Sequence, residues 1–206
     1  MKVVVQNLQK RSHSATVLVQ EYEPDVLLAQ EFSLTSEDQH IFPAHFTSKS
    51  GYGTAIYGKQ TSAILNVRHV ESPNAEVCGF IHKKTTVADY MGVEFVSFHG
   101  YNGQPIKNIS KLIDHVDAAL TVVSASGPAV FAGDFNTWTQ AHLDGVKVKM
   151  EKANFHLARS WPYPGRDFPL DHVFVREMRV EAFSTFRTKS DHTGALLELY
   201  PITQDS

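Results

Sequence analysis

Val130-Phe131-Ala132-Gly133-Asp134-Phe135-Asn136 is an apolar run that stops at a glycine and then presents a carboxylate and an amide two residues apart. Side chains at positions i and i+2 leave an extended segment on the same side. Asp134 and Asn136 can therefore face one bound group together. An isolated aspartate at a strand end is usually a turn former, but this pairing with an amide predicts a functional edge of a sheet.

Two later stretches also place polar residues beside apolar runs. Ser190-Asp191-His192 precedes Ala195-Leu196-Leu197-Glu198-Leu199, and Leu170-Asp171-His172-Val173-Phe174 puts a carboxylate into an otherwise apolar strand. Because side chains alternate along a strand, His172 faces away from Asp171. We therefore expect His172 to be structural or on the surface, and Asp171, Asp191 and His192 to be functional.

The composition indicates a globular chain with a sizeable core. Of its 206 residues, 42% are hydrophobic and 11% are aromatic, and we find no internal repeat or linker, so we expect a single α/β domain over residues 1–206. The single cysteine, Cys78, excludes an internal disulfide, is compatible with a reducing compartment and is expected in the core. The net charge of -3 argues against binding nucleic acid by bulk charge, although a local basic surface is compatible with it.

The sequence also lacks the usual targeting signals. Met1-Lys2-Val3-Val4-Val5 resembles a strand and not a signal peptide. No apolar run approaches the roughly 20 residues that span a bilayer. We expect a cytoplasmic, monomeric protein with no membrane partner.

The apolar spacing predicts strands and helices along the whole chain. Glycines and prolines break residues 44–98 into short aromatic segments that are typical of hairpins, and the apolar positions from Ile109 to Val123 recur at helical spacing. The other expected strands are residues 3–5, 25–30, the region around 173, 180–186 and 195–199, and the other expected helices are 12–22 and 140–153. Lys83-Lys84 is expected to be a solvated hairpin tip.

Polar groups recur where the apolar strands end, and such ends can converge at one rim of two packed sheets. They are Asn7, Glu31, His99, Asp134, Asn136, Asp171, Asp191 and His192. Carboxylates and amides are hard oxygen donors of the kind that Mg2+ or Mn2+ prefers, whereas no spacing of Cys or His fits a zinc site. Two histidines beside such a metal site could assist cleavage of a phosphodiester.

The ordered set of these motifs resembles the endonuclease/exonuclease/phosphatase superfamily, which includes proteins similar to DNase I and exonuclease III. The resemblance covers the whole chain. Its motifs are Asn7, Ala29-Gln30-Glu31, Gly51-Tyr52-Gly53-Thr54-Ala55-Ile56, Phe98-His99-Gly100-Tyr101-Asn102, Gly133-Asp134-Phe135-Asn136-Thr137-Trp138, Leu170-Asp171-His172-Val173-Phe174 and Ser190-Asp191-His192. Gln6 departs from the family's usual Trp before the asparagine.

The resemblance implies a four-layered α/β/β/α sandwich of two mixed sheets, with a divalent-metal phosphoesterase site at one rim. It implies that Glu31 binds the metal with support from Asn7, and that Asp191 completes the metal environment. Asp134 would orient or deprotonate the attacking water, and Asn136 would hold a phosphate oxygen. His192 would contact the scissile phosphate while Asp171 fixes its tautomer, and His99 would be a second catalytic histidine, with Glu76 as its carboxylate partner.

Several positions have a structural alternative. Asn7 could cap the following helix, and His99 could be a core residue. Tyr101 and Asn102 could contact the phosphate or only shape a turn. The aromatic stretch 159–168 could contact phosphate and stack on bases, or be a rigid proline turn.

The sequence thus favours a Mg2+- or Mn2+-dependent phosphodiesterase, specifically a nuclease acting on DNA or RNA. A phosphatase or phosphodiesterase of a small substrate, such as a nucleotide, inositol phosphate or lipid headgroup, is the nearest alternative, since the chain is short and acidic. A non-catalytic binding module is a third, disfavoured because no catalytic position is lost.

Overall fold

A computed structural model describes residues 1–11, 13–35, 40–47, 51–76, 79–103 and 107–202. Within them the chain forms two six-stranded sheets, ordered β11-β12-β1-β2-β4-β3 and β5-β6-β7-β8-β10-β9. The strands are β1 (Lys2–Asn7), β2 (Val26–Phe32), β3 (Ala44–Thr47), β4 (Gly53–Gly58), β5 (Ile64–Glu71), β6 (Lys84–Tyr90), β7 (Val93–His99), β8 (Ala129–Asp134), β9 (His156–Trp161), β10 (Asp171–Arg176), β11 (Met178–Arg187) and β12 (Thr193–Pro201).

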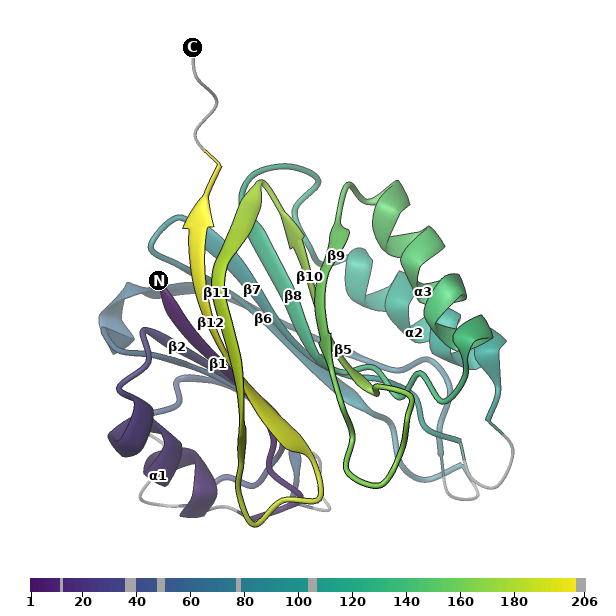
Figure 1. Ribbon diagram of the computed structural model, residues 1–206, viewed down its shortest axis with the longest axis horizontal. Helices are drawn as coiled ribbons and strands as arrows, with labels where there is room; N and C mark the ends of the chain where they lie inside the picture. Colours follow the sequence, from purple (N-terminus) through teal and green to yellow (C-terminus); the bar gives the residue numbers. More distant parts are fainter. Residues whose placement is uncertain (12, 36–39, 48–50, 77–78, 104–106, 203–206) are drawn as a thin grey trace.

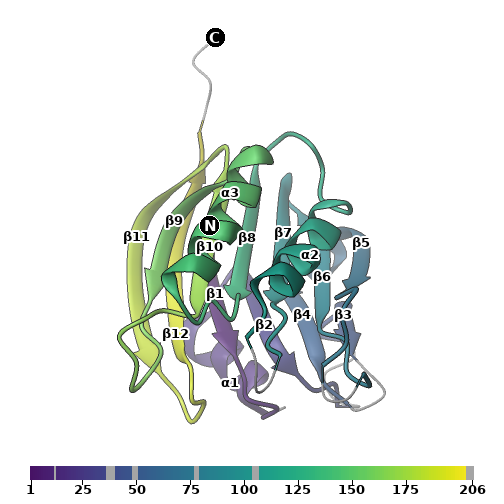
Figure 2. The same ribbon diagram turned by 90° about the vertical axis from the view of Figure 1, so that its right-hand side faces the viewer.

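Helices cover the outer face of each sheet. Helix α1 (His13–Tyr22) lies on the first sheet, where Leu18 packs with Val4 and Leu27. Helices α2 (Ile109–Leu120) and α3 (Gln140–Lys152) lie side by side on the second sheet (Figure 2). A short 3-10 turn, Thr61–Ala63, precedes β5.

The two long helices begin where the sequence provides caps. The side chain of Asn108 accepts a hydrogen bond from the Lys111 amide, and the side chain of Thr139 accepts one from the His142 amide. Each cap satisfies a backbone donor that has no partner inside the helix. The predicted helices are therefore confirmed, with α2 ending three residues before the expected end at Val123.

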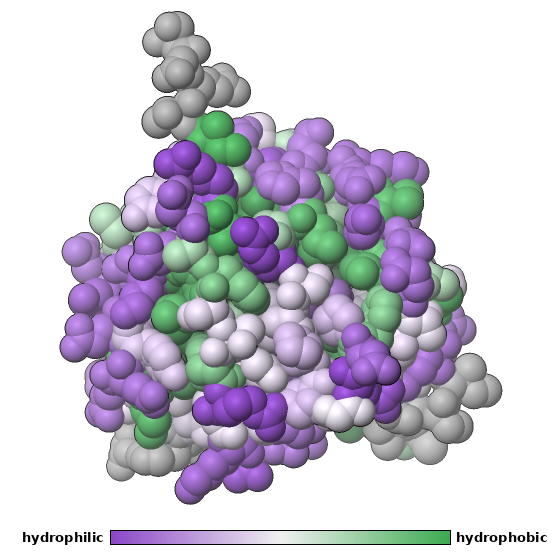
Figure 3. All heavy atoms as spheres, in the orientation of Figure 1, coloured by the Kyte–Doolittle hydropathy of each residue, from purple (hydrophilic) through white to green (hydrophobic). Residues whose placement is uncertain are grey.

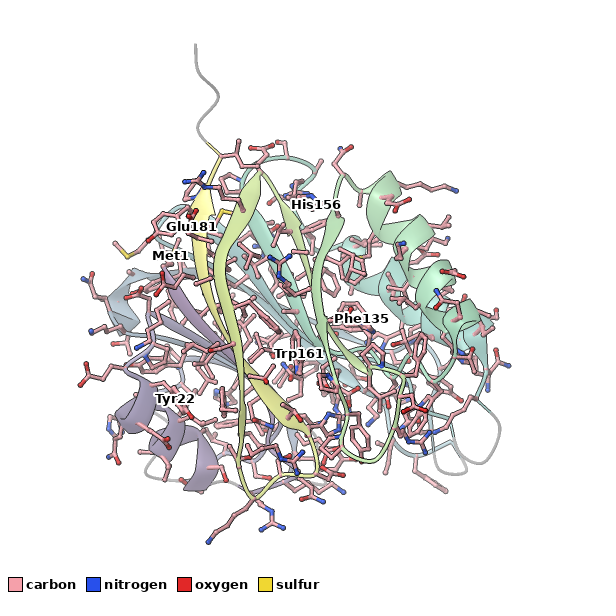
Figure 4. The ribbon with its side chains drawn as sticks, viewed as in Figure 1. Met1, Tyr22, Phe135, His156, Trp161 and Glu181 are labelled. Atoms are coloured by element: carbon pink, nitrogen blue, oxygen red, sulfur yellow. The ribbon has the colours of Figure 1, made fainter. Side chains whose placement is uncertain are left out.

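Three apolar interfaces hold the four layers together, and the first is the contact of α1 with the first sheet. The core between the sheets contains Phe95, Trp161 and Val173, whereas Phe131 and Phe135 pack between the second sheet and its helices. Figure 4 shows Trp161 beneath the strands and Phe135 on the side that faces α2 and α3. The predicted four-layered α/β/β/α sandwich is confirmed.

The face drawn in Figure 3 mixes hydrophilic and hydrophobic residues, and the exposed apolar residues include Tyr200 and Ile202 near the C-terminal end of β12. No helix in the described part of the chain is long and apolar enough to cross a bilayer. Cys78 lies outside the described residues.

The expectation of an aromatic loop over residues 159–168 is wrong for its first three residues. Arg159, Ser160 and Trp161 belong to β9, which pairs with β10. Trp161 is buried between the sheets and its indole donates to the Thr193 carbonyl, so it cannot stack on a base. The strand was hidden because its sequence, His-Leu-Ala-Arg-Ser-Trp, lacks β-branched residues.

Candidate active site

Six of the predicted site residues meet at one rim of the sandwich. β1, β2, β7 and β8 end there, and β10 and β12 begin there, at the lower edge of Figure 1. Their polar side chains are Asn7, Glu31, His99, Asp134, Asp171 and His192. The parallel pairs β1–β2 and β7–β8 place consecutive motif residues on the same edge, as the sequence predicted.

Asp134 is the centre of the group. Its Oδ2 accepts a hydrogen bond from Asn7 Nδ2 at 3.0 Å, and lies 3.6 Å from the Nε2 atoms of both His99 and His192. Its Oδ1 accepts from the Asn136 amide at 3.0 Å. Burial raises the pKa of Asp134 to about 6, against the opposing charge of His192. A carboxylate with this pKa can exchange a proton near neutral pH.

The backbone beside these groups adopts unusual conformations. Glu31 and Asn136 have positive φ, 48° and 54°, and Glu31 lies where the register of β2 against β4 shifts. Asparagine tolerates this region, but glutamate there costs about 1–2 kcal/mol. Such strain is concentrated at functional sites, and here it turns the Glu31 side chain out of the pleat of β2.

Gly133 lets the two strands of the rim approach closely. Its φ is 142°, and a Cβ on it would lie 2.2 Å from the Phe98 carbonyl oxygen. No other residue could fit without moving the β7 backbone away from β8. The glycine before Asp134 is therefore required by packing at the point where the site begins.

His192 and Asp171 form a buried pair. The Nδ1 atom of His192 lies 2.8 Å from Asp171 Oδ2, so Nδ1–H donates to the carboxylate and Nε2 points toward Asp134. Burial lowers the pKa of His192, but Asp171 and Asp134 outweigh burial and raise it to about 10. The structure thus brings this predicted pair together, and the imidazole is a cation at neutral pH.

The raised pKa makes stability depend on pH. Because the unfolded-state pKa is near 6.5, the contribution of charged His192 is fully present below about pH 6.5 and is lost as the pH rises through about 10. In EDTA, urea unfolding should show wild type losing more stability than His192→Gln between pH 7 and 10. Parallel pH profiles for the two proteins would contradict the pairing.

His99 has a different environment from His192. It is 1% exposed, and its Nε2 lies 2.7 Å from Lys83 Nζ. Lysine can only donate, so Nε2 accepts and the ring is neutral. Burial lowers the pKa of His99 well below its ordinary value, and Lys83 adds to the effect.

The expectation that Lys83 and Lys84 form a solvated hairpin tip is wrong. Lys83 is 6% exposed and Lys84 is 8% exposed. Lys83 points into the site, while Lys84 pairs with Glu71 and lies over the Phe46 ring. The two side chains leave opposite faces of β6, which a reading of the dipeptide alone could not show.

The expected partner of His99 is also corrected. Glu76 Oε2 lies 3.8 Å from Lys83 Nζ, and its Oε1 accepts from the Asn102 amide. Among the described residues, the close contacts of His99 Nε2 are Lys83, Glu31 at 3.7 Å and Asp134 at 3.6 Å. Lys83 therefore stands between Glu76 and His99.

Glu31 fits a metal ligand in its surroundings. Its side chain is 20% exposed, burial raises its pKa, and Lys83 opposes that rise. No hydrogen bond to its carboxylate is found within the described ranges, so this partly buried carboxylate lacks a donor there. Carboxylates of Asp134 and Asp171 with His192 form a further group whose ligand atoms lie within 4.8 Å of one another. These hard donors suit a divalent cation.

Asn7 does not cap α1. Its Oδ1 accepts from the Gln9 amide and its Nδ2 donates to Asp134, which leaves the side chain in the site. Gln6, before it, donates to the Asn7 carbonyl at 2.6 Å, so an amide braces the backbone at the position of the family's usual Trp.

The remaining predicted residues lie in the loops around the six that meet at the rim. Asp191 is exposed and accepts a hydrogen bond from Tyr163 Oη, and Asn136 Nδ2 donates to the Gly100 carbonyl. Tyr101 is largely buried, and Asn102 Oδ1 accepts from Trp138 Nε1 and from Lys107. Asn136 thus fastens the β8 end to the His99 loop.

A family model described as the Endonuclease/Exonuclease/phosphatase family matches residues 6–192. The chain belongs to this family. The match begins one residue before Asn7 and ends at His192, so it spans all the motifs that meet at the rim. Membership and the two mixed sheets confirm the resemblance and the fold expected from the sequence.

Relatives in the family leave the substrate open. A UPF0294 protein of Vibrio campbellii is 25% identical over 190 residues, covering 84% of this chain and 66% of the relative. UPF0294 protein VP2298 of Vibrio parahaemolyticus is 36% identical over 77 residues, which are 35% of this chain and 27% of the relative. The chain thus spans less than two thirds of either protein.

Two solved structures of family proteins share the fold. The 3' phosphatase NExo from Neisseria, bound to a product DNA hairpin, has a TM-score of 0.71 at 14% identity and covers 96% of this chain and 98% of its own. An AP endonuclease from Archaeoglobus fulgidus has a TM-score of 0.68 at 13% identity, with the same coverages. At these identities the likeness establishes the fold alone.

Proposed function

We propose that residues 1–206 form a single domain that hydrolyses phosphodiester bonds in DNA or RNA with a bound Mg2+ or Mn2+. The observation that carries the proposal is the contact set of Asp134, which joins Asn7, His99 and His192 at one carboxylate. Beside it, Glu31 is a partly buried carboxylate that lacks a hydrogen-bond donor among the described residues. If these residues had only a structural role, each of their charged groups would be expected to have a hydrogen-bond partner within the protein.

The protonation state of each residue determines its proposed role in the reaction. Asp134 orients a water molecule and takes its proton, for which its pKa of about 6 is suited. The water oxygen bonds to phosphorus as the P–O bond to the leaving oxygen breaks, and the leaving oxygen takes a proton from solvent. His192, cationic and held by Asp171, donates from Nε2 to a phosphate oxygen. Asn136 holds a second phosphate oxygen, and neutral His99 is kept in one tautomer by Lys83.

Glu31 and Asn7 would hold the divalent cation, with Asp191 at the open side of the site. When bound, the cation supplies Lewis-acid stabilisation of the charge that develops on phosphate oxygens. Lys83 lies close enough to affect Glu31, His99 and Asp134 electrostatically. It therefore offers a fixed positive charge at the floor of the site.

Local positive charge favours a nucleic acid, which carries many phosphates, over a small phosphoester with few. The chain carries a net charge of -3, yet the charges of Lys83 and Lys10 both act on Glu31. The Nζ atom of Lys10 lies 4.4 Å from the centroid of the Tyr52 ring, at the same rim of the sandwich. The Neisseria 3' phosphatase, which shares the fold, is bound to a DNA product, and this supports the same class of substrate.

Lys83→Met is expected to lower kcat by about 100-fold, the scale for removing one preorganised positive donor. The matched control is Lys84→Met, which removes the neighbouring buried lysine from the opposite face and should change kcat by less than about twofold. Steady-state kinetics on one phosphodiester substrate measure both. Equal losses in the two variants would show that Lys83 acts through stability alone.

A panel of substrates tests the proposed class. Labelled single-stranded DNA, duplex DNA, abasic DNA and RNA are compared with a nucleotide, an inositol phosphate and a lipid headgroup at equal Mg2+. We expect the highest kcat/KM on a nucleic acid. A higher kcat/KM on any of the small phosphoesters would establish the alternative function instead.

A further inference from the structure

Trp138, two residues beyond Asn136, carries two cations on its ring. Lys107 Nζ lies 4.0 Å from the ring centroid, and Arg166 Cζ lies 4.1 Å from it. We call Asn102, Lys107, Trp138 and Arg166 the Trp138 cluster. The four residues come from three separate segments: the loop after β7, the loop after β8 and the loop before β10.

Hydrogen bonds hold the cluster in place. Asn102 Oδ1 accepts from Trp138 Nε1 at 2.9 Å and also from Lys107 Nζ, so one carbonyl fixes both the ring and the ammonium. The Asn102 amide donates to Glu76, which anchors the loop to the floor of the site. Asn102 therefore orients these groups, in contrast to a residue that only shapes a turn.

A tight turn directs Arg166 onto the ring. The Arg166 amide donates to the Tyr163 carbonyl, and Pro164 and Gly165 occupy the middle of the turn, with a φ of 77° at Gly165. Proline followed by a residue with positive φ is typical of a type II turn. The same turn places Tyr163 edge-on against His192, at 4.8 Å between ring centroids.

In the part of the chain that the structure describes, neither Lys107 nor Arg166 forms a salt bridge with a carboxylate within 4.0 Å. The charge of Glu76 acts on Lys107 without pairing with it. Arg166 is exposed and Lys107 is partly exposed, so both can reach a ligand in solvent. An aromatic ring holds such cations without neutralising them, which leaves their hydrogen-bond donors available to an anion.

We propose that the Trp138 cluster is a second anion site, which binds a phosphate of a nucleic acid strand next to the phosphate held by His192 and Asn136. The inference rests on the proposed function, since it treats that anion as part of the same substrate. The cluster adjoins the first site through the chain, because the Trp138 amide donates to the Asn136 carbonyl. A substrate with a single phosphate leaves the cluster empty.

Binding to a fluorescein-labelled short single-stranded DNA tests the proposal without turnover. The full chain and its Lys107→Met/Arg166→Met variant are compared in EDTA by fluorescence anisotropy over a range of salt. The expected result is a Kd at least about tenfold higher for the variant, with the slope of log K against log salt reduced by about 1.4, from two phosphate contacts. Thermal melts check that the variant is folded.

The charge-matched control is Lys59→Met/Lys152→Met, which removes two exposed lysines away from the rim. Its Kd and salt slope should equal those of the wild type. The inference is overturned if the cluster variant matches this control, or if both variants weaken binding equally. A changed Kd in a protein that hydrolyses no phosphoester would uphold the anion site and reject the proposed reaction, so the two failures are distinguishable.

Discussion

Asp134→Asn is expected to lower kcat for phosphodiester hydrolysis by more than about 100-fold, because it removes the group that orients and deprotonates the water. The exposed residue Asp144 supplies the matched control. Asp144→Asn also replaces a carboxylate by an amide, and should keep the wild-type kcat. Activity within about tenfold of wild type in Asp134→Asn would exclude Asp134 from the chemistry.

The thermal midpoint of Asp134→Asn distinguishes a loss of kcat caused by lost chemistry from one caused by misfolding. Burial raises the pKa of Asp134, so the contribution of this group to stability is greatest below about pH 4 and falls as the pH rises through about 6. Removing its charge therefore carries no electrostatic cost at neutral pH. We expect the thermal midpoint of Asp134→Asn at pH 7 to equal or exceed that of wild type, and a much lower midpoint would make the kinetic loss structural.

His192→Gln is expected to have the second largest effect, again more than about 100-fold in kcat. The substitution removes a cation whose Nε2 faces Asp134 and whose Nδ1 is held by Asp171. Glutamine keeps a donor of similar reach but no positive charge. Single-turnover measurements with saturating enzyme separate chemistry from binding.

The control for His192→Gln is His172→Gln. His172 is a buried histidine of β10, the residue after Asp171, and contacts Thr137 and Ser160 away from the reacting groups. His172→Gln should lower the thermal midpoint, and its single-turnover rate should stay within about tenfold of that of wild type. If His192→Gln slows the chemical step no more than His172→Gln does, charged His192 is not needed for the reaction.

The convergence of the site residues was predictable from the sequence because each motif residue stands at one end of an apolar run. Asn7, Glu31, His99 and Asp134 reach one rim through the parallel pairs β1–β2 and β7–β8. Asp171 and His192 reach it because β10 and β12 start there, antiparallel to β8 and β1. Alternation along β10 also assigned His172 to the face opposite Asp171, where it is buried. Local pattern was sufficient for these positions.

Residues that depend on contacts across the sandwich could not be predicted in the same way. Lys83 follows no motif, and only its place directly before β6, next to the end of β7, brings it to His99. Lys107 and Arg166 lie 59 positions apart in the sequence, and only Trp138 brings them together. A pair of adjacent lysines in a polar stretch provides no signal that both are buried.

The most direct test of the central claim is metal dependence of hydrolysis, measured on the nucleic acid and small phosphoester panel with wild type and Asp134→Asn purified in parallel. We predict that wild type hydrolyses at least one substrate with Mg2+ or Mn2+, that EDTA abolishes the activity and that added metal restores it, while Asp134→Asn remains inactive throughout. Hydrolysis that survives EDTA, that is equal in Asp134→Asn, or that is absent on every substrate would contradict the account.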